Sequence, residues 1–113
     1  MDVARRRKIL ENIKEHVGWT NEHLEWMMHL PYIVDSATMV FREFAKSTDN
    51  IEDKIKTLKA LSVADTYKET YDDWLESIER EDENFDAVMD RFAKIESEWL
   101  NVVAMMDQLM HND

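Results

Sequence analysis

The sequence predicts an all-α protein: a helical bundle of three to four antiparallel helices with a long, coiled-coil-like C-terminal helix. Its 113 residues include one glycine, Gly18, and one proline, Pro31, whereas the turns of a β-sheet protein need several of each. Apolar residues make up 44% of the chain and recur every three to four positions, which is the spacing of one helical face. This length and composition predict one helical domain over residues 1–113.

We expect a first helix over residues 2–30, with Gly18 as a weak point inside it. Pro31 lacks a backbone N–H and restricts the residue before it, so the first helix should end there and a second should cover 32–46. The first helix should bury Leu10, Ile13, Val17, Thr20, Leu24 and Met27. The second should bury Ile33, Ala37, Val40, Phe41 and Phe44.

Residues 47–50 are the clearest loop, because three successive N-cap residue types precede two acids. They predict a third helix that starts at Ile51. We expect it to end at Ser62, because residues 62–65 resemble a capping box with Asp65 in the acidic position. The third helix should bury Ile51, Ile55, Leu58 and Leu61.

From Ala64 onward the apolar residues keep one register of alternating three- and four-residue steps, interrupted only by Glu81. The members of this seam are Ala64, Tyr67, Tyr71, Trp74, Ile78, Glu81, Phe85, Val88, Phe92, Ile95, Trp99, Val102, Met106 and Leu109. The charged segment 79–84 could break the helix, but it holds no glycine or proline and the register continues across it. We therefore favour one helix over 64–110. It would be about 70 Å long, more than the other segments could cover, and so predicts a homodimer or another partner.

The same stretch carries an acidic stripe that faces away from the seam. Its members are Asp65, Glu69, Asp72, Glu76, Glu79, Glu83, Asp86 and Asp90. Neighbouring members are like charges three or four residues apart, and each such pair destabilises a helix by about 0.2–0.5 kcal/mol. Because no lysine or arginine falls in the stripe, three interpretations stay open: solvation, docking of a basic partner, and docking of the chain's own basic cluster Arg5-Arg6-Arg7-Lys8.

Charge is unevenly divided along the chain. Residues 1–63 hold ten acids and ten Lys or Arg, whereas residues 64–113 hold fifteen acids and four Lys or Arg, which accounts for the net charge of −11. This acidic half disfavours direct binding of nucleic acid or an anionic membrane and favours a basic protein surface as partner. The chain has no cysteine and no apolar run of membrane-spanning length, so we expect a cytoplasmic protein.

Few residues suggest catalysis. Glu22, Glu25 and His29 share one face of the first helix, where an exposed, structural role is the simplest interpretation. The pairs Glu22-x-x-Glu25 and Glu69-x-x-Asp72 are only faintly similar to the carboxylate pairs through which all-helical nucleotide pyrophosphatases bind magnesium, and we infer no membership of that family. The interval between the pairs is longer here, and the second pair falls on the acidic stripe. No cofactor, metal site or catalytic residue is predicted.

Methionines gather near the ends of two helices, at Trp26-Met27-Met28 and at Met105, Met106 and Met110. Core filling is the simplest interpretation, and an adaptable apolar contact surface is the alternative.

The sequence thus predicts a protein-binding module with an acidic recognition face, in its sharpest form an inhibitor that occupies a basic nucleic-acid-binding groove. A secretion or assembly chaperone that binds an apolar helix is the second interpretation. A metal-dependent helical-bundle enzyme is the third.

Overall fold

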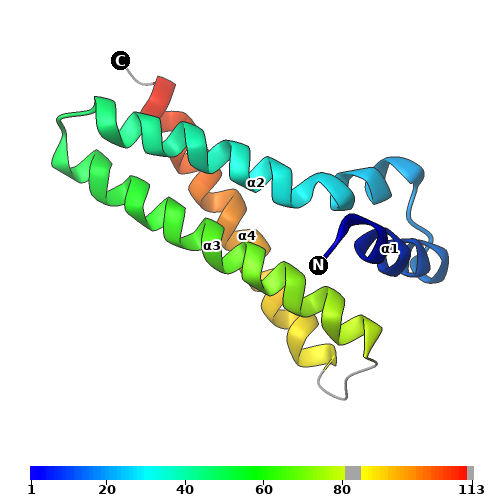
Figure 1. Cartoon of the computed structure of the whole chain (residues 1–113). Helices are drawn as coiled ribbons and strands as arrows, with labels where there is room; N and C mark the ends of the chain where they lie inside the picture. Colours follow the sequence, from blue (N-terminus) through cyan, green and yellow to red (C-terminus); the bar gives the residue numbers. More distant parts are fainter. Residues whose placement is uncertain (81–84, 112–113) are drawn as a thin grey trace.

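The computed structural model describes residues 1–80 and 85–111, and all secondary structure in these ranges is α-helical. The helices are α1 (Val3–Val17), α2 (Asn21–Ser47), α3 (Ile51–Glu79) and α4 (Phe85–His111). α2, α3 and α4 run along an elongated bundle of 48 × 27 × 23 Å, and α1 packs against α2 and α3 at one end (Figure 1). The predicted all-α bundle is confirmed, and its C-terminal helix, α4, is long at 27 residues.

The predicted first helix is wrong in its length, because the chain leaves the helical conformation at Gly18. Gly18 adopts left-handed angles (φ 75°, ψ 32°), and its N–H and that of Trp19 donate to the carbonyl of Lys14 at 2.9 and 3.2 Å. Thr20 then caps α2, its hydroxyl accepting from the N–H of His23 at 3.1 Å. Glycine reaches the left-handed region without steric cost, so the weak point ends the helix.

The predicted helix end at Pro31 is also wrong, because α2 runs straight through this residue. Pro31 cannot donate the helical hydrogen bond to the carbonyl of Met27, four residues earlier. The hydroxyl of Tyr71 on α3 donates to that carbonyl instead, at 2.6 Å. Burial raises the pKa of Tyr71, so the hydroxyl keeps its proton. A tertiary hydrogen bond therefore replaces the helical one.

Because α2 is continuous, its buried stripe keeps the register of its first half. Val34, Thr38 and Phe41 are buried in line with Met27, and Phe41 was expected in the core. Ile33 and Val40 were expected in the core too, but they are 36% and 53% exposed. That prediction started a new register at Pro31, where the helix does not restart.

The predicted loop precedes α3, which begins where expected, with the side chain of Asn50 accepting from the N–H groups of Glu52 and Asp53. The expected end at Ser62 is wrong. Ser62 is exposed inside the helix, and its carbonyl accepts a hydrogen bond from the hydroxyl of Thr66 at 3.2 Å. α3 continues for 17 further residues because the seam from Ala64 extends backward through it.

The buried residues at the start of α3 are Thr57 and Ala60, each at 0% exposure, in register with Ala64. Ile51, Ile55 and Leu58 were expected to be buried, but they are 71%, 60% and 63% exposed. The side chains of Thr57 and Ala60 are small, so the neighbouring helices can pack closely against them. The Thr57 hydroxyl contacts the sulfur of Met106 on α4 at 3.7 Å. At the start of α3, the position of a residue in the helical register therefore decides whether it is buried, even where the more hydrophobic residue is left exposed.

The favoured continuous helix over 64–110 is wrong, and the break that the sequence left possible is present. α3 ends at Glu79 with Arg80 as its C-cap, and α4 begins at Phe85. Residue Glu81 of the seam and the rest of 81–84 lie outside the described residues. α4 returns antiparallel along α3, so the two halves of the seam face each other (Figure 1).

Aromatic rings join the two halves of the seam. Trp74 and Phe92 stack at 4.7 Å between centroids, and Tyr67 lies between Phe92 and Trp99 at 5.8 and 5.9 Å. Because the α3 half of the seam packs against the α4 half, no second chain is needed to bury it. The homodimer therefore stays a prediction, without the support of an uncovered seam. None of the helices in the described ranges is long and apolar enough to cross a membrane.

Candidate functional site

One face of α3 points away from the core along the whole helix. Its side chains follow alternating steps of four and three residues, opposite the buried Ala64 and Tyr71. We call this set the outward row: Ile51, Ile55, Leu58, Ser62, Asp65, Glu69, Asp72, Glu76 and Glu79. All of them are exposed except Glu76, which is half-buried. The row is about 40 Å long, and it is apolar at the start and acidic from Asp65 onward.

The acidic part of the outward row contains three carboxylates that make no ion pair with a lysine or arginine in the described chain. Asp65, Glu69 and Asp72 line a shallow pocket of about 300 Å³ together with Lys68. The ammonium of Lys68 pairs with Asp35 on α2, so it is already engaged. In the described ranges no ion pair joins these three carboxylates to a lysine or arginine. Their negative charge therefore faces solvent.

The acidic stripe predicted from the sequence is not one continuous row. Five of its members lie on α3, whereas Asp86 and Asp90 lie exposed on the first turns of α4 and Glu83 lies outside the described residues. Since α4 runs antiparallel to α3, Asp86 and Asp90 do not extend the outward row. The end of α3 at Glu79 is the physical reason for this division.

The last acid of the outward row binds the chain's own basic cluster. The guanidinium Nε of Arg5 donates to both carboxylate oxygens of Glu79, at 3.0 and 2.9 Å, and Nη2 donates to Oε1. This hydrogen bonding holds the pKa of Glu79 below its ordinary value and raises that of Arg5. Docking of the basic cluster, one of the three interpretations of the stripe, is therefore observed at this end.

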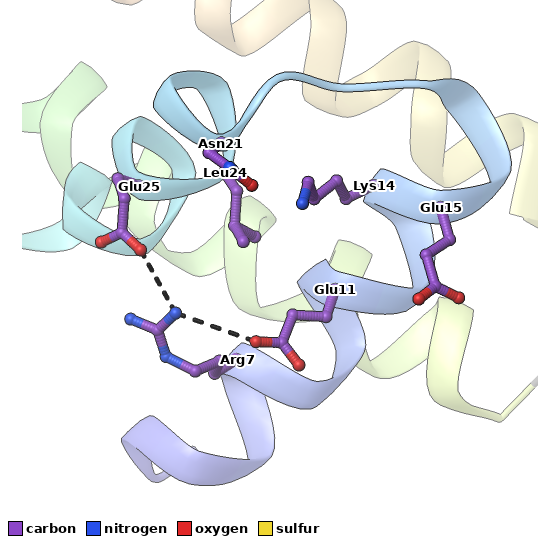
Figure 2. A pocket seen from close by; sticks show the side chains of 7 residues that line it. All are labelled: Arg7, Glu11, Lys14, Glu15, Asn21, Leu24 and Glu25. Carbon is purple, nitrogen blue, oxygen red and sulfur yellow. Dashed lines mark hydrogen bonds and ion pairs between the residues drawn. The ribbon is translucent and has the colours of Figure 1, made fainter.

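A second arginine of α1 reaches α2 across a polar cleft of about 300 Å³ (Figure 2). Arg7 binds Glu25 at 3.2 Å and Glu11 at 3.9 Å, and the side chains of Lys14 and Glu15 lie farther along the cleft (Figure 2). Glu25 is thus held in an ion pair.

The other residues considered for catalysis or metal binding do not form a metal site in the described chain; they are Glu22, Glu25 and His29 on α2 and the pair Glu69 and Asp72 on α3. His29 contacts Glu25 through its ring, with Nδ1 at 2.7 Å from the Glu25 carbonyl. Within residues 1–80 and 85–111 no group of three or more His, Asp or Glu is placed to hold a metal ion. The pairs at Glu22 and Glu69 therefore do not form a joint metal site in the described chain.

Three of the six predicted apolar contact residues lie in the core. Met27, Met28 and Met106 are buried at 4%, 5% and 0% exposure, as core filling predicts. Met105 and Met110 are half-buried. Trp26 is 51% exposed, and it is the one member of this predicted contact surface that lies open to solvent.

The sequence missed an apolar pocket at the end of the bundle that α1 covers. Its volume is about 600 Å³, and it lies between the second half of α1, the end of α3 and the start of α4. The lining residues are Asn12, Ile13, His16, Val17, Trp19, Trp74, Ile78 and Met89. Four of them, Ile13, Val17, Trp74 and Ile78, belong to stripes predicted as core, but a stripe gives no sign of where two helices leave space between them.

The chain matches no protein-family model, no curated protein and no solved structure.

Proposed function

We propose that the chain is a non-catalytic protein-binding module that recognises a basic protein surface through the outward row of α3. The observation that carries this proposal is the composition of the row. Three large apolar side chains, 60–71% exposed, lie in one line with three carboxylates, Asp65, Glu69 and Asp72, that make no ion pair with a lysine or arginine in the described chain. A partner would gain free energy by covering the apolar side chains and by placing positive charge beside the carboxylates.

The apolar start of the row favours a protein as the partner. Exposed Ile51, Ile55 and Leu58 follow one another on successive turns. Apolar groups gathered on a surface mark protein–protein contacts, because covering them releases water. A highly charged polymer such as nucleic acid would leave this part of the row uncovered, and the acids would repel it.

The acidic part of the row sets the charge of the partner. Asp65, Glu69 and Asp72 follow one another at rises of about 4.5–6 Å. A nucleic-acid strand carries a phosphate about every 3.4 Å of duplex axis, so the row is a more widely spaced line of the same charge. We infer that the partner surface is a basic groove that binds a phosphate backbone. By occupying that groove, the chain would inhibit the nucleic-acid-binding protein that contains it. We place this interaction in the cytoplasm.

The proposal is tested by capture on the immobilised chain from native lysate at about 50 and 500 mM salt. Basic nucleic-acid-binding proteins should be retained at low salt and released at high salt, because screening weakens exposed charge pairs. Each captured protein, once purified, should release its bound nucleic acid when the chain is added, measured by mobility shift.

Two double variants that change the net charge by the same amount test whether the outward row is the binding site. Glu69→Lys with Asp72→Lys should abolish capture, whereas Asp86→Lys with Asp90→Lys on α4 should retain it. Substituting Ile55 and Leu58 by serine should weaken capture without changing its response to salt. Equal loss in both charge variants would show that net charge alone acts. Capture that ignores both salt and charge reversal would contradict the proposal.

A further inference from the structure

The apolar pocket beneath α1 has the size and lining of a site for a small molecule. Ligand pockets of about 300–1,000 Å³ are lined mainly by apolar and aromatic side chains with a few polar groups, and this one of about 600 Å³ follows that pattern. The buried Trp74 (3% exposed) and the half-buried Ile78 come from α3, and Val17 (61% exposed) stands at the rim. The site shares no residue with the outward row.

The dimensions favour a small molecule over a partner helix. The α1 residues that line the pocket run from Asn12 to Val17, about 8 Å of helix, and those of α3 span Trp74 to Ile78, about 6 Å. A helix of three turns needs an apolar groove about 16 Å long. One or two fused aromatic rings fit the shorter space.

Two aromatic walls and a sulfur define the chemistry of the ligand. Trp19 and Trp74 contribute indole rings, and Met89 contributes a polarizable thioether next to the Trp74 N–H. Aromatic ligands gain from such walls through stacking and sulfur–ring contacts as well as burial.

One polar group has a fixed donor and acceptor pattern. The Nδ1 of His16 lies 2.9 Å from the backbone carbonyl of Asn12. A carbonyl can only accept, so Nδ1 carries the hydrogen, and in the neutral ring Nε2 is left as an acceptor. A ligand hydroxyl or N–H could donate to it.

We propose that this pocket binds a small, largely apolar aromatic molecule that carries one hydrogen-bond donor. The hydrophobic body occupies the space between Trp19, Trp74 and Ile78, and the donor meets Nε2 of His16. The proposal stands independently of the protein partner, because the pocket and the outward row are separate surfaces.

The test is titration of the full chain with 1-naphthol at about pH 8, followed by NMR through the indole N–H signals of its four tryptophans. The signals of Trp19 and Trp74 should shift and saturate with a dissociation constant of about 0.1–1 mM, as expected for eleven heavy atoms. Trp26 and Trp99 lie outside the pocket and serve as internal controls. 1-Methylnaphthalene, which has the same size but no donor, should bind about 2- to 10-fold more weakly.

Variants separate the parts of the site. Val17→Trp should fill the pocket and abolish the shifts without placing a polar group in the core, and circular dichroism checks that the helices are kept. His16→Leu should make the two compounds bind equally. Leu100→Trp, at a position 58% exposed on α4, is the control that should leave binding unchanged. Equal shifts at all four tryptophans, or saturable binding that survives Val17→Trp, would overturn the proposal, as would no shift up to the solubility limit.

Discussion

At the scale of single residues, the hydroxyl of Tyr71 decides how the chain passes Pro31. The proline removes the N–H that would satisfy the Met27 carbonyl, and a buried carbonyl without a partner costs about 1–3 kcal/mol. Tyr71 is fully buried and donates to that oxygen at 2.6 Å from another helix. A proline in a sequence predicts a helix end only when nothing distant supplies the missing donor, and the sequence around Pro31 cannot show that it is supplied.

We expect Tyr71→Phe to lower the free energy of unfolding by about 1–3 kcal/mol, because it leaves the Met27 carbonyl unsatisfied in the core. The matched background is Pro31→Ala, which restores the helical N–H. In that background Tyr71→Phe should cost clearly less, and chemical denaturation of the four proteins measures the coupling. Equal costs in both backgrounds would mean that the tyrosine does not act through this carbonyl.

At the scale of helices, periodicity predicted which faces are buried better than it predicted where helices end. The seam from Ala64 onward is buried at nearly every described position, because a 3–4 register directs one face to the core whichever helix carries it. Helix ends depend on single residues. The sequence pattern predicts Gly18 inside a helix, but its left-handed conformation ends α1. The pattern predicts a helix end at Ser62, but the buried register continues past this residue and α3 continues with it.

The end of α1 makes a testable case. Gly18 has φ 75°, and a Cβ added there would meet no atom within 4 Å, so backbone strain alone should set the cost of a side chain. We expect Gly18→Ala to lower the free energy of unfolding by about 1–2 kcal/mol. Gly18→Asn should cost less, since asparagine tolerates the left-handed region. Thermal unfolding followed by circular dichroism measures both, and equal costs would show that the left-handed conformation is not the cause.

At the scale of the whole molecule, the fold brings the basic start of the chain to its acidic half. Arg5 lies 74 residues from Glu79 in sequence, yet the two form a bidentate ion pair. The sequence predicted the acids of α3 and left docking of the basic cluster open, because charge patterns show sign but not distance. It could not predict that Asp86 and Asp90 separate from the other acids, since that depends on the reversal of direction between α3 and α4.

This ion pair should make the docking of α1 depend on pH on the acid side. The pKa of Glu79 is below its ordinary value of 4.5 in the folded chain, so its stabilising contribution is complete above that value and is lost as the pH falls through the folded pKa. The same hydrogen bonding raises the pKa of Arg5 above its ordinary, strongly basic value, so its contribution is present at all lower pH and is lost only above that value. Between about pH 5 and 3, the protection of the α1 amides against hydrogen exchange, corrected for intrinsic rates, should therefore fall.

Glu79→Gln isolates the contribution of the pair. At neutral pH this variant should lower the protection of α1 by about 2- to 5-fold, as for other exposed ion pairs, and it should remove part of the acid-side decline. Asp72→Asn is the matched control on the same helix face, because Asp72 makes no ion pair with α1 in the described chain, and it should leave the α1 amides unchanged. About 0.5 M salt should reduce wild-type protection toward the Glu79→Gln level, because the pair is exposed and screened. If Glu79→Gln and wild type have the same protection at every pH, the Arg5–Glu79 pair does not hold α1, and its docking depends on the packing of Ile9 and Leu10 and on the Arg7–Glu25 pair.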